Sequence, residues 1–190
     1  MRSYKTQLPF PFYPKEYFSH ALIVVAVIVS VLGFLFPGIV SLFGFHHISL
    51  SGDGMILFIG QLFLYQFLHG SILHILFNSY FLYQAGPEVE TRMSKGRFQL
   101  FFLLNTIFVA AALWFFAPYS LTIGISGFCM AILSYLWIDL HTAHHPMANQ
   151  ILVMLVLNIA IGFMGNISFV GHFFGAVFGL IWWYFRKKQW

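Results

Sequence analysis

The sequence predicts an all-α polytopic membrane protein, and three observations lead to this fold class. Hydrophobic residues make up 60% of the 190 positions and charged residues only 7%, far below the roughly 25% of soluble domains. Four long stretches contain no Asp, Glu, Lys or Arg: residues 17–52, 54–87, 98–138 and 140–185. The nine Lys and Arg residues fall into three short segments. This composition excludes a soluble enzyme, a disordered chain and the continuous basic stripe of a nucleic-acid-binding protein.

Six apolar segments are candidates to cross a hydrocarbon core that requires about 20 helical residues. Cutting the uncharged stretches at their Pro, Gly, His and Ser-rich breaks gives spans near Tyr17–Phe36, Phe67–Tyr83, Phe98–Phe116, Ser126–Leu140, Met147–Phe163 and Phe169–Phe185. The apolar segment Met55–Gln66 has only 12 residues, and we expect it to lie in the membrane interface within a long first loop. The first span follows a mixed polar start without a small-residue cleavage site, so we expect it to be a permanent anchor rather than a signal peptide.

The basic residues predict the orientation, because Lys and Arg are retained on the cytoplasmic side of short loops. In a six-span arrangement all nine fall on one side, and an odd number of spans would place the last three opposite: Arg2, Lys5, Lys15, Arg92, Lys95, Arg97, Arg186, Lys187 and Lys188. We therefore expect one membrane domain over residues 1–190, in the inner or plasma membrane, with a cytoplasmic N-terminal segment (1–16) and a cytoplasmic tail (186–190).

The fourth predicted span opens with Gly124-Ile125-Ser126-Gly127. A serine at this place is ordinarily a helix cap. The 15 residues from Ser126 to Leu140, however, cover only about 22 Å at 1.5 Å per residue, so this helix is short and Ser126 is expected below the outer surface, reached by a dipping loop. Non-helical backbone at that depth is tolerated only inside protein or beside a water-filled cavity. A serine in such a place is a candidate nucleophile.

The sixth predicted span carries glycines at every fourth position, Gly171, Gly175 and Gly179. They form a flat ridge that another helix can approach closely. His172 lies near the edge of the same face; a lone intramembrane histidine is ordinarily a hydrogen-bonded interior residue rather than a base. Because Gly127 also permits close approach, we expect the fourth span to pack here and Ser126 to meet His172 in the outer third of the membrane.

The second predicted span carries His69-x4-His74-x3-Asn78. His74 and Asn78 are one helical turn apart on one face. Polar residues inside spans often only join helices, and a histidine pair can also bind zinc. No acidic or thiolate ligand is near in the sequence and the only cysteine is Cys129, so we expect no metal. Neutral donors beside a backbone N–H suit the stabilisation of an oxyanion formed in acyl transfer.

In combination and order, these motifs resemble the rhomboid intramembrane serine proteases, in their bacterial six-helix form. The resemblance covers the second to sixth spans, about two thirds of the chain, and includes Glu90-Thr91-Arg92 with Gly96 at the cytoplasmic turn after the second span. It implies a rhomboid-like bundle and a serine endopeptidase that needs no cofactor and cleaves transmembrane proteins within the lipid bilayer. It also implies that Ser126 is the nucleophile, that His172 is its general base, that His74 and Asn78 join the Ser126 N–H in the oxyanion hole, and that His69 is structural or organises water. Gly124, Gly127, Gly171, Gly175 and Gly179 would support the site.

Three departures from the family pattern predict a divergent and slow protease. The first-loop Trp-Arg pair of many members is replaced by Gly60 and Gln61. The aromatic residue expected four positions after the nucleophile, which stacks on the catalytic imidazole, is Met130 here, whose thioether can still pack against a ring. The polar residue often found just before the last histidine is absent, since Phe169 and Val170 occupy that stretch.

Two other functions remain open from the sequence. One is a catalytically silent rhomboid-like protein that binds transmembrane helices for quality control. The other is a metal transporter using His69, His74, His141, His144 and His145. The last three lie in a polar turn before Pro146, far from the first two in the six-span arrangement, which disfavours a shared metal site.

Overall fold

The chain is all-helical in the computed structural model, which describes residues 17–47, 53–164 and 167–187. Within these ranges the helices and 3-10 turns are α1 (Phe18–Leu35), α2 (Pro37–Phe43), α3 (Gly54–Leu64), η1 (Tyr65–Phe67), α4 (Ile72–Glu90), α5 (Lys95–Phe116), α6 (Ser126–Thr142), α7 (Ala148–Ala160), η2 (Ile161–Phe163) and α8 (Phe169–Lys187). Of the nine basic residues, Arg2, Lys5, Lys15 and Lys188 lie outside the described ranges. The predicted all-α class is confirmed.

A helix lies at each of the six predicted span positions, namely α1, α4, α5, α6, α7 with η2, and α8. By length and composition, α1 and α5 are candidates to cross a membrane on their own. A third candidate is the pair formed by α3 with η1 and α4, which is bent by 77°. Ala148–Phe163 and Phe169–Phe185 are shorter apolar helices. The chain is thus an apolar helical bundle, and a count of six crossings stays a prediction.

The outward faces of the bundle are apolar, as expected of an integral membrane protein. Ile28 on α1 is 56% exposed, Phe77 on α4 is 68% exposed and Leu157 on α7 is 62% exposed. Contiguous apolar surface of this kind is rare on soluble monomers. These faces match the composition, which lacks the charged residues needed for a water-facing surface.

The second predicted span begins later than expected. The prediction started this helix at Phe67, but α4 begins at Ile72 and the preceding turn η1 ends at Phe67. Ser71 adopts an extended backbone and its hydroxyl accepts a hydrogen bond from the His74 N–H at 3.1 Å, which caps α4. His69 therefore lies in the loop before α4, and its predicted place on the same helix as His74 is wrong.

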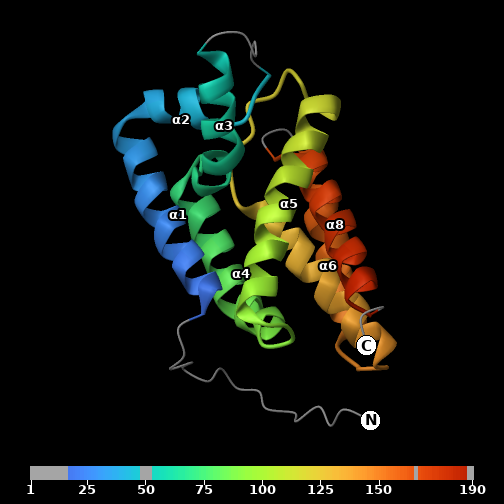
Figure 1. Ribbon diagram of the computed structural model, residues 1–190. Helices are drawn as coiled ribbons and strands as arrows, with labels where there is room; N and C mark the ends of the chain where they lie inside the picture. The colour runs from blue at the N-terminus through green and yellow to red at the C-terminus, as the bar shows by residue number, and fades with distance from the viewer. Residues whose placement is uncertain (1–16, 48–52, 165–166, 188–190) are drawn as a thin grey trace.

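Helix α6 is enclosed by its neighbours, and Figure 1 shows it behind α5 and beside α8. Residues 127–136 are buried without interruption, and α6 packs against α4, α5, α7 and α8. A helix that is hydrophobic on all sides is stable only when it is buried on all sides, and the sequence from Phe128 to Leu136 is of this kind apart from Ser134 and Tyr135. The central position fixes where Ser126, the first residue of α6, is placed.

Polar contacts join four helices at one end of the bundle. The Glu90 carboxylate at the end of α4 accepts hydrogen bonds from the N–H groups of Phe18 and Ser19, at 2.8 and 3.1 Å, and so caps α1. Arg92 pairs with Glu88 and donates to Asp139 of α6 at 2.6 Å. Asp139 also accepts from Trp183 of α8.

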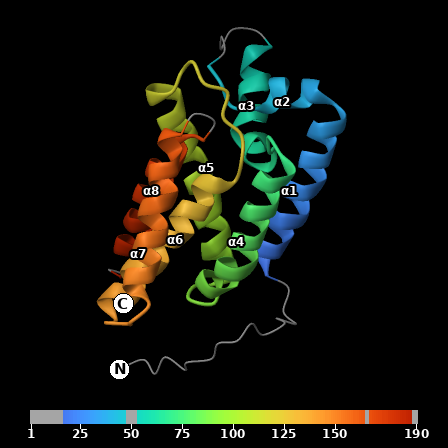
Figure 2. The ribbon, with the colours of Figure 1, turned by 180° about the vertical axis from the view of Figure 1, so that it is seen from behind.

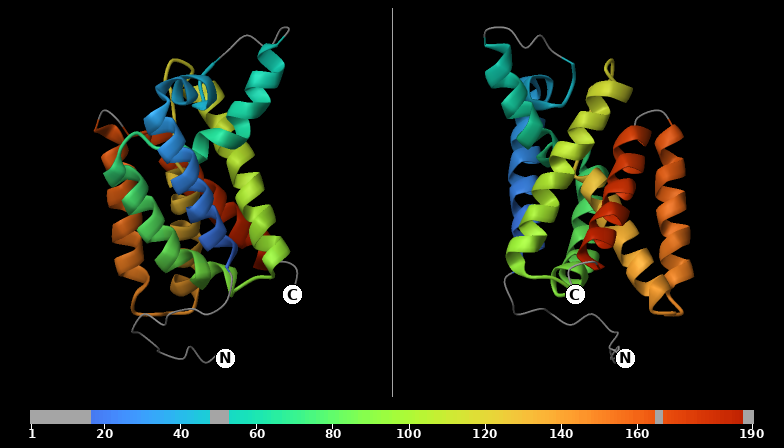
Figure 3. Two further views of the ribbon diagram at one scale, coloured as in Figure 1. Left: turned by 90° about the vertical axis from the view of Figure 1, so that its left-hand side faces the viewer. Right: turned by 45° about the vertical axis from the view of Figure 1, so that its right-hand side comes forward.

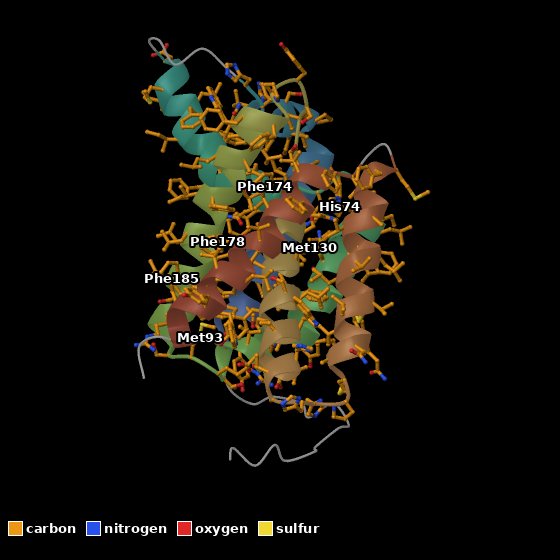
Figure 4. The ribbon with its side chains drawn as sticks, turned by 90° about the vertical axis from the view of Figure 1, so that its right-hand side faces the viewer. His74, Met93, Met130, Phe174, Phe178 and Phe185 are labelled. Atoms are coloured by element: carbon orange, nitrogen blue, oxygen red, sulfur yellow. The ribbon has the colours of Figure 1, made fainter. Side chains whose placement is uncertain are left out.

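The start of α1, the α4–α5 turn, the α6–α7 turn and the end of α8 all lie at this lower end in Figure 3. Figure 4 shows the labelled Met93 and Phe185 there as well. Of the five described basic residues, Arg92, Lys95 and Arg97 belong to the α4–α5 turn and the first turn of α5, and Arg186 and Lys187 belong to the last turn of α8. This arrangement agrees with the predicted one-sided charge distribution.

Candidate active site

The site is organised around the segment that leads from α5 to α6. Figure 2 shows this segment descending from the upper end of α5 to the middle of the bundle before α6 begins. Phe45 and Thr122 exchange backbone hydrogen bonds of 2.9 and 2.8 Å, and the Gly124 N–H donates to the Tyr65 carbonyl at 3.0 Å. Irregular backbone at membrane depth needs such partners within the protein. The predicted dipping loop and short following helix are both present.

Ser126 begins α6 as predicted, and the helix ends two residues beyond the predicted Leu140. Its 17 residues cover about 25 Å. The Ser126 side chain is half-buried. At the first residue of a helix the backbone N–H has no intrahelical partner, so the hydroxyl and an available backbone donor lie together in the middle of the bundle.

Gly124 is held in a conformation and an environment that only glycine fits. Its φ angle is +114°, in the region that side chains rarely adopt. A Cβ atom built on Gly124 would lie 2.8 Å from Cε1 and 2.9 Å from Nε2 of His74, and 3.8 Å from Nδ2 of Asn78. The backbone two residues before Ser126 therefore lies directly against the face of α4 that carries both polar side chains.

In the described part of the chain, the Asn78 side-chain amide has an N–H donor without a partner near Gly124. Its side chain is 8% exposed, and its Nδ2 atom has no hydrogen-bond partner among the described residues. Buried amide groups are normally paired, so an orphaned one calls for an explanation. Its other end, Oδ1, accepts from the Cys129 thiol with 3.9 Å between the heavy atoms. Sequence reasoning did not foresee this contact.

His172 lies in the first turn of α8, 5% exposed. Its Nδ1 is 2.7 Å from the backbone carbonyl of Asn158 in the last turn of α7. A carbonyl only accepts, so Nδ1 carries the proton and the neutral ring has its lone pair at Nε2. The sequence did not predict this role for Asn158, because any residue type can supply a backbone carbonyl. The available signal was its position at the end of α7, where carbonyls lack helical partners.

The glycine ridge of α8 packs on α6, as predicted. A Cβ on Gly175 would lie 2.1 Å from the Gly127 carbonyl oxygen, and one on Gly127 would lie 3.2 Å from the Gly171 carbonyl oxygen. A Cβ on Gly179 would lie 2.1 Å from the Ala131 carbonyl oxygen. The two helices therefore touch through their backbones next to Ser126 and His172.

Ser126, the candidate nucleophile, and His172, the candidate base, lie on these two contacting turns. Among the described residues there is no direct hydrogen bond between them. Catalytic hydrogen bonds are often long in proteins without bound substrate and tighten only in its presence. The four polar side chains from α4, α6 and α8 thus converge on one region.

His69 has a structural role, because it forms a hydrogen bond with α1. Its Nδ1 lies 2.9 Å from the Ser30 hydroxyl, which in turn donates to the Phe67 carbonyl at 3.0 Å. Its ring meets the edge of the His74 ring with 4.7 Å between centroids. His69 therefore ties the loop before α4 to α1, and it reaches the site only through His74.

Met130 is 4% exposed and lies within the core around α6. Figure 4 shows the labelled Met130 and His74 at similar heights in the bundle. Its predicted packing against the His172 ring stays a prediction. The position itself is fully enclosed, so a larger residue there would have to displace core neighbours.

The residues in place of the Trp-Arg pair fasten α3 to the protein. The Gln61 side chain is fully buried, donates to the Leu42 carbonyl at 3.2 Å and lies 3.3 Å from Nδ1 of His46. A Cβ on Gly60 would lie 3.1 Å from the Phe43 ring. Figure 3 shows α3 leaning outward above the bundle, anchored at this end to α2.

The other histidines of the metal-transporter alternative lie elsewhere. His141 is in the last turn of α6, and His144 and His145 follow it in the α6–α7 turn. His141 lies 15 positions after Ser126 on this helix, about 22 Å along the axis. No group of three or more His, Cys, Asp or Glu side chains suited to a metal ion occurs among the described residues.

Comparisons with known proteins identify the family of this chain. Residues 59–189 match the family model described as Rhomboid domain. The chain is 32% identical over 117 residues to Rhomboid protease GluP of Bacillus subtilis (strain 168), covering 59% of this chain and 23% of that protein. It is 30% identical over 134 residues to Rhomboid protease GlpG of Haemophilus influenzae (strain ATCC 51907 / DSM 11121 / KW20 / Rd), covering 63% and 66%.

Rhomboid protease GlpG of Serratia proteamaculans (strain 568) is 27% identical over 124 residues, 62% of this chain and 44% of that protein. The chain thus spans between 23% and 66% of the length of these relatives. The matched region contains α4 to α8 and every polar side chain of the candidate site. This integral membrane protein belongs to the rhomboid family.

Proposed function

We propose that this chain is an intramembrane serine endopeptidase with Ser126 as nucleophile and His172 as general base. The observation that carries the proposal is the backbone contact of Gly127 with Gly171 and Gly175, which places the first turns of α6 and α8 against each other. The Nδ1 contact of His172 with Asn158 supports it, because the lone pair then remains at Nε2, the atom that must accept a proton.

The reaction follows from these groups. Nε2 of His172 accepts the hydroxyl proton as Ser126 Oγ attacks the substrate carbonyl, and the proton is then passed to the leaving amine. The resulting acyl-enzyme is hydrolysed by a water molecule that His172 activates in the same way. The two-step route needs no cofactor.

The negative charge on the attacked oxygen requires donors that are already in place. Nδ2 of Asn78 is buried without a partner, His74 lies against Gly124, and the Ser126 N–H belongs to the free end of α6. Donors fixed in a water-poor site stabilise an oxyanion without reorganising in the reaction. We therefore assign these three groups to the oxyanion hole.

Alanine at position 74 or 78 is expected to lower turnover while the protein stays folded, since each change removes one donor and leaves Ser126 and His172 in place. The expected loss is on the order of 10 to 1000-fold, measured as cleavage of a single-pass substrate in lipid vesicles. Wild-type turnover in the His74→Ala, Asn78→Ala double variant would show that both residues only join helices.

The substrates in this proposal are transmembrane helices of other proteins. The candidate nucleophile lies in the middle of the bundle at the foot of a descending loop (Figure 2), where a water-soluble peptide has no reason to accumulate. A helical substrate must unwind locally to expose a carbonyl. Residues of low helix propensity reduce the cost of that step, glycine by roughly 1 kcal/mol relative to alanine.

The proposal includes six crossings with both termini in the cytoplasm. The clustering of the start of α1, the α4–α5 turn and the end of α8 at one end supports it (Figure 3), together with the basic residues of that turn. Reporter fusions after residue 50 or 120 are expected to report the outside, and fusions after residue 95 or 188 the cytoplasm. A cytoplasmic signal at residue 120 would contradict the placement of Ser126.

Cleavage by the wild type and by Ser126→Ala tests the proposed function. Both proteins are reconstituted with a single-pass substrate carrying a helix-breaking residue near its outer end. Product is expected only from the wild type, because the variant lacks the attacking hydroxyl. Absence of cleavage by folded wild type, with retained binding of transmembrane helices, would instead identify a silent helix-binding member.

A further inference from the structure

An asparagine can stabilise an oxyanion in only one of its two amide orientations. The NH2 group must face the charged oxygen, since the carbonyl end would repel it. Because the two ends have the same shape, only hydrogen bonds determine which end points into the site. Asn78 is buried, its Nδ2 is unpartnered, and that atom lies 3.8 Å from the position of a Cβ on Gly124. The NH2 end thus faces the backbone next to Ser126.

The opposite end of the amide contacts Cys129. The thiol sulfur lies 3.9 Å from Asn78 Oδ1, and the side chain is 1% exposed on α6, three residues after Ser126. A thiol is a weak donor, but it is the hydrogen-bond partner that Oδ1 has among the described side chains. If the amide turned over, the S–H···O contact would be replaced by an N–H···S contact, in which the sulfur is only a weak acceptor.

From this geometry we infer that Cys129 is a positioning residue that keeps the NH2 end of Asn78 directed at the oxyanion. The inference rests on the proposed function. Cys129 does not touch the reacting atoms and acts only through the orientation of Asn78. An apolar residue at position 129 would fill the same space and leave the amide without this restraint.

The test measures kcat and KM for cleavage of a single-pass substrate in vesicles by Cys129→Ala and Cys129→Val. Both changes remove the S–H donor, but alanine is smaller than cysteine and valine is larger. An effect on kcat shared by both variants therefore follows from loss of the donor and not from a change in packing. A fall in kcat of about 2 to 10-fold is expected for both, the range of one ordinary hydrogen bond, with KM unchanged because substrate binding is not altered.

The same changes are then made in the Asn78→Ala background. There they are expected to cause no further fall in kcat, because a residue that acts through Asn78 has nothing left to orient. Ile132→Val is the matched control: Ile132 is fully buried on α6, it loses one methylene, and its kcat is expected to equal that of the wild type.

The outcomes separate the inference from the function on which it rests. Wild-type kcat in both Cys129 variants, or an equal loss with and without Asn78, would overturn the positioning role while cleavage by the wild type and its absence in Ser126→Ala would uphold the protease. A wild type that does not cleave would overturn both. Thermal unfolding of each variant shows whether a loss of kcat follows from loss of fold.

Discussion

Replacing His172 by alanine is expected to slow acylation of Ser126 by a fluorophosphonate by on the order of 10⁴-fold or more, the size of effect known for loss of a histidine base in serine proteases. The hydroxyl of Ser126 is a weak nucleophile until a base accepts its proton. In this protein the Nε2 lone pair of His172 is the candidate for that task, since Nδ1 is occupied by the Asn158 carbonyl. Labelling is followed by mass spectrometry in lipid, maps to Ser126 in the wild type and disappears in Ser126→Ala.

The matched control is His141→Ala, which removes an imidazole from the opposite end of α6 and is expected to label at the wild-type rate. Labelling of the wild type should also fall in acid, because a protonated His172 cannot accept the proton. Unchanged labelling of His172→Ala would refute its role as base. Resistance of the folded wild type to every probe of this kind would favour the silent, helix-binding alternative.

Helix positions were predictable from the sequence where the ends of apolar runs coincide with Gly, Pro or Ser residues that break or cap helices. The first residue of α6 coincides with the predicted Ser126, because Pro118, Ser120, Thr122 and Gly124 end the apolar run of α5 and a new apolar run begins at Phe128. The start of α4 was misplaced because Phe67 and Leu68 continue the apolar pattern into η1 and the loop. The break lies at Gly70 and Ser71, residues that typically mark such a boundary.

The packing of α8 on α6 was also predictable, because a four-residue glycine spacing has one main use in a membrane helix. The partners that orient the site were not. Asn158 contributes a backbone oxygen, and Cys129 contacts a residue 51 positions away, so neither follows from a local pattern. The replacement of the Trp-Arg pair was visible in the sequence, but the buried contacts of Gln61 with Leu42 and His46 depend on the path of the first loop.

Replacing Gly175 by alanine is expected to destabilise the protein strongly, because the added methyl group has no room between α8 and α6. Its Cβ would lie 2.1 Å from the carbonyl oxygen and 3.0 Å from the Cα of Gly127. Both atoms belong to the backbone of α6, so no side chain can rotate away and the two helices must separate. Overpacking typically costs 1–3 kcal/mol and occasionally more, and we expect about 3 kcal/mol of unfolding free energy to be lost here.

The same change is expected to reduce catalysis beyond its effect on stability. Gly127 follows Ser126 directly and Gly175 lies three residues after His172, so a separation of α6 from α8 moves the base from the nucleophile. A misplacement of about 1 Å can cost on the order of 100-fold in rate. The measurement compares fluorophosphonate labelling of Ser126, carried out well below the unfolding temperature of the variant, with a separate thermal unfolding curve.

Gly96→Ala supplies the matched control for this prediction. It adds the same methyl group to a helix, α5, at a position where the new Cβ meets no atom within 4 Å beyond its chain neighbours and the adjacent helix backbone. Alanine favours helix over glycine by about 1 kcal/mol. Its stability is expected to be unchanged or slightly raised and its labelling rate unchanged. If Gly175→Ala behaved like Gly96→Ala, the close contact between α6 and α8 would not be what holds Ser126 and His172 together, and the dyad would need another structural basis.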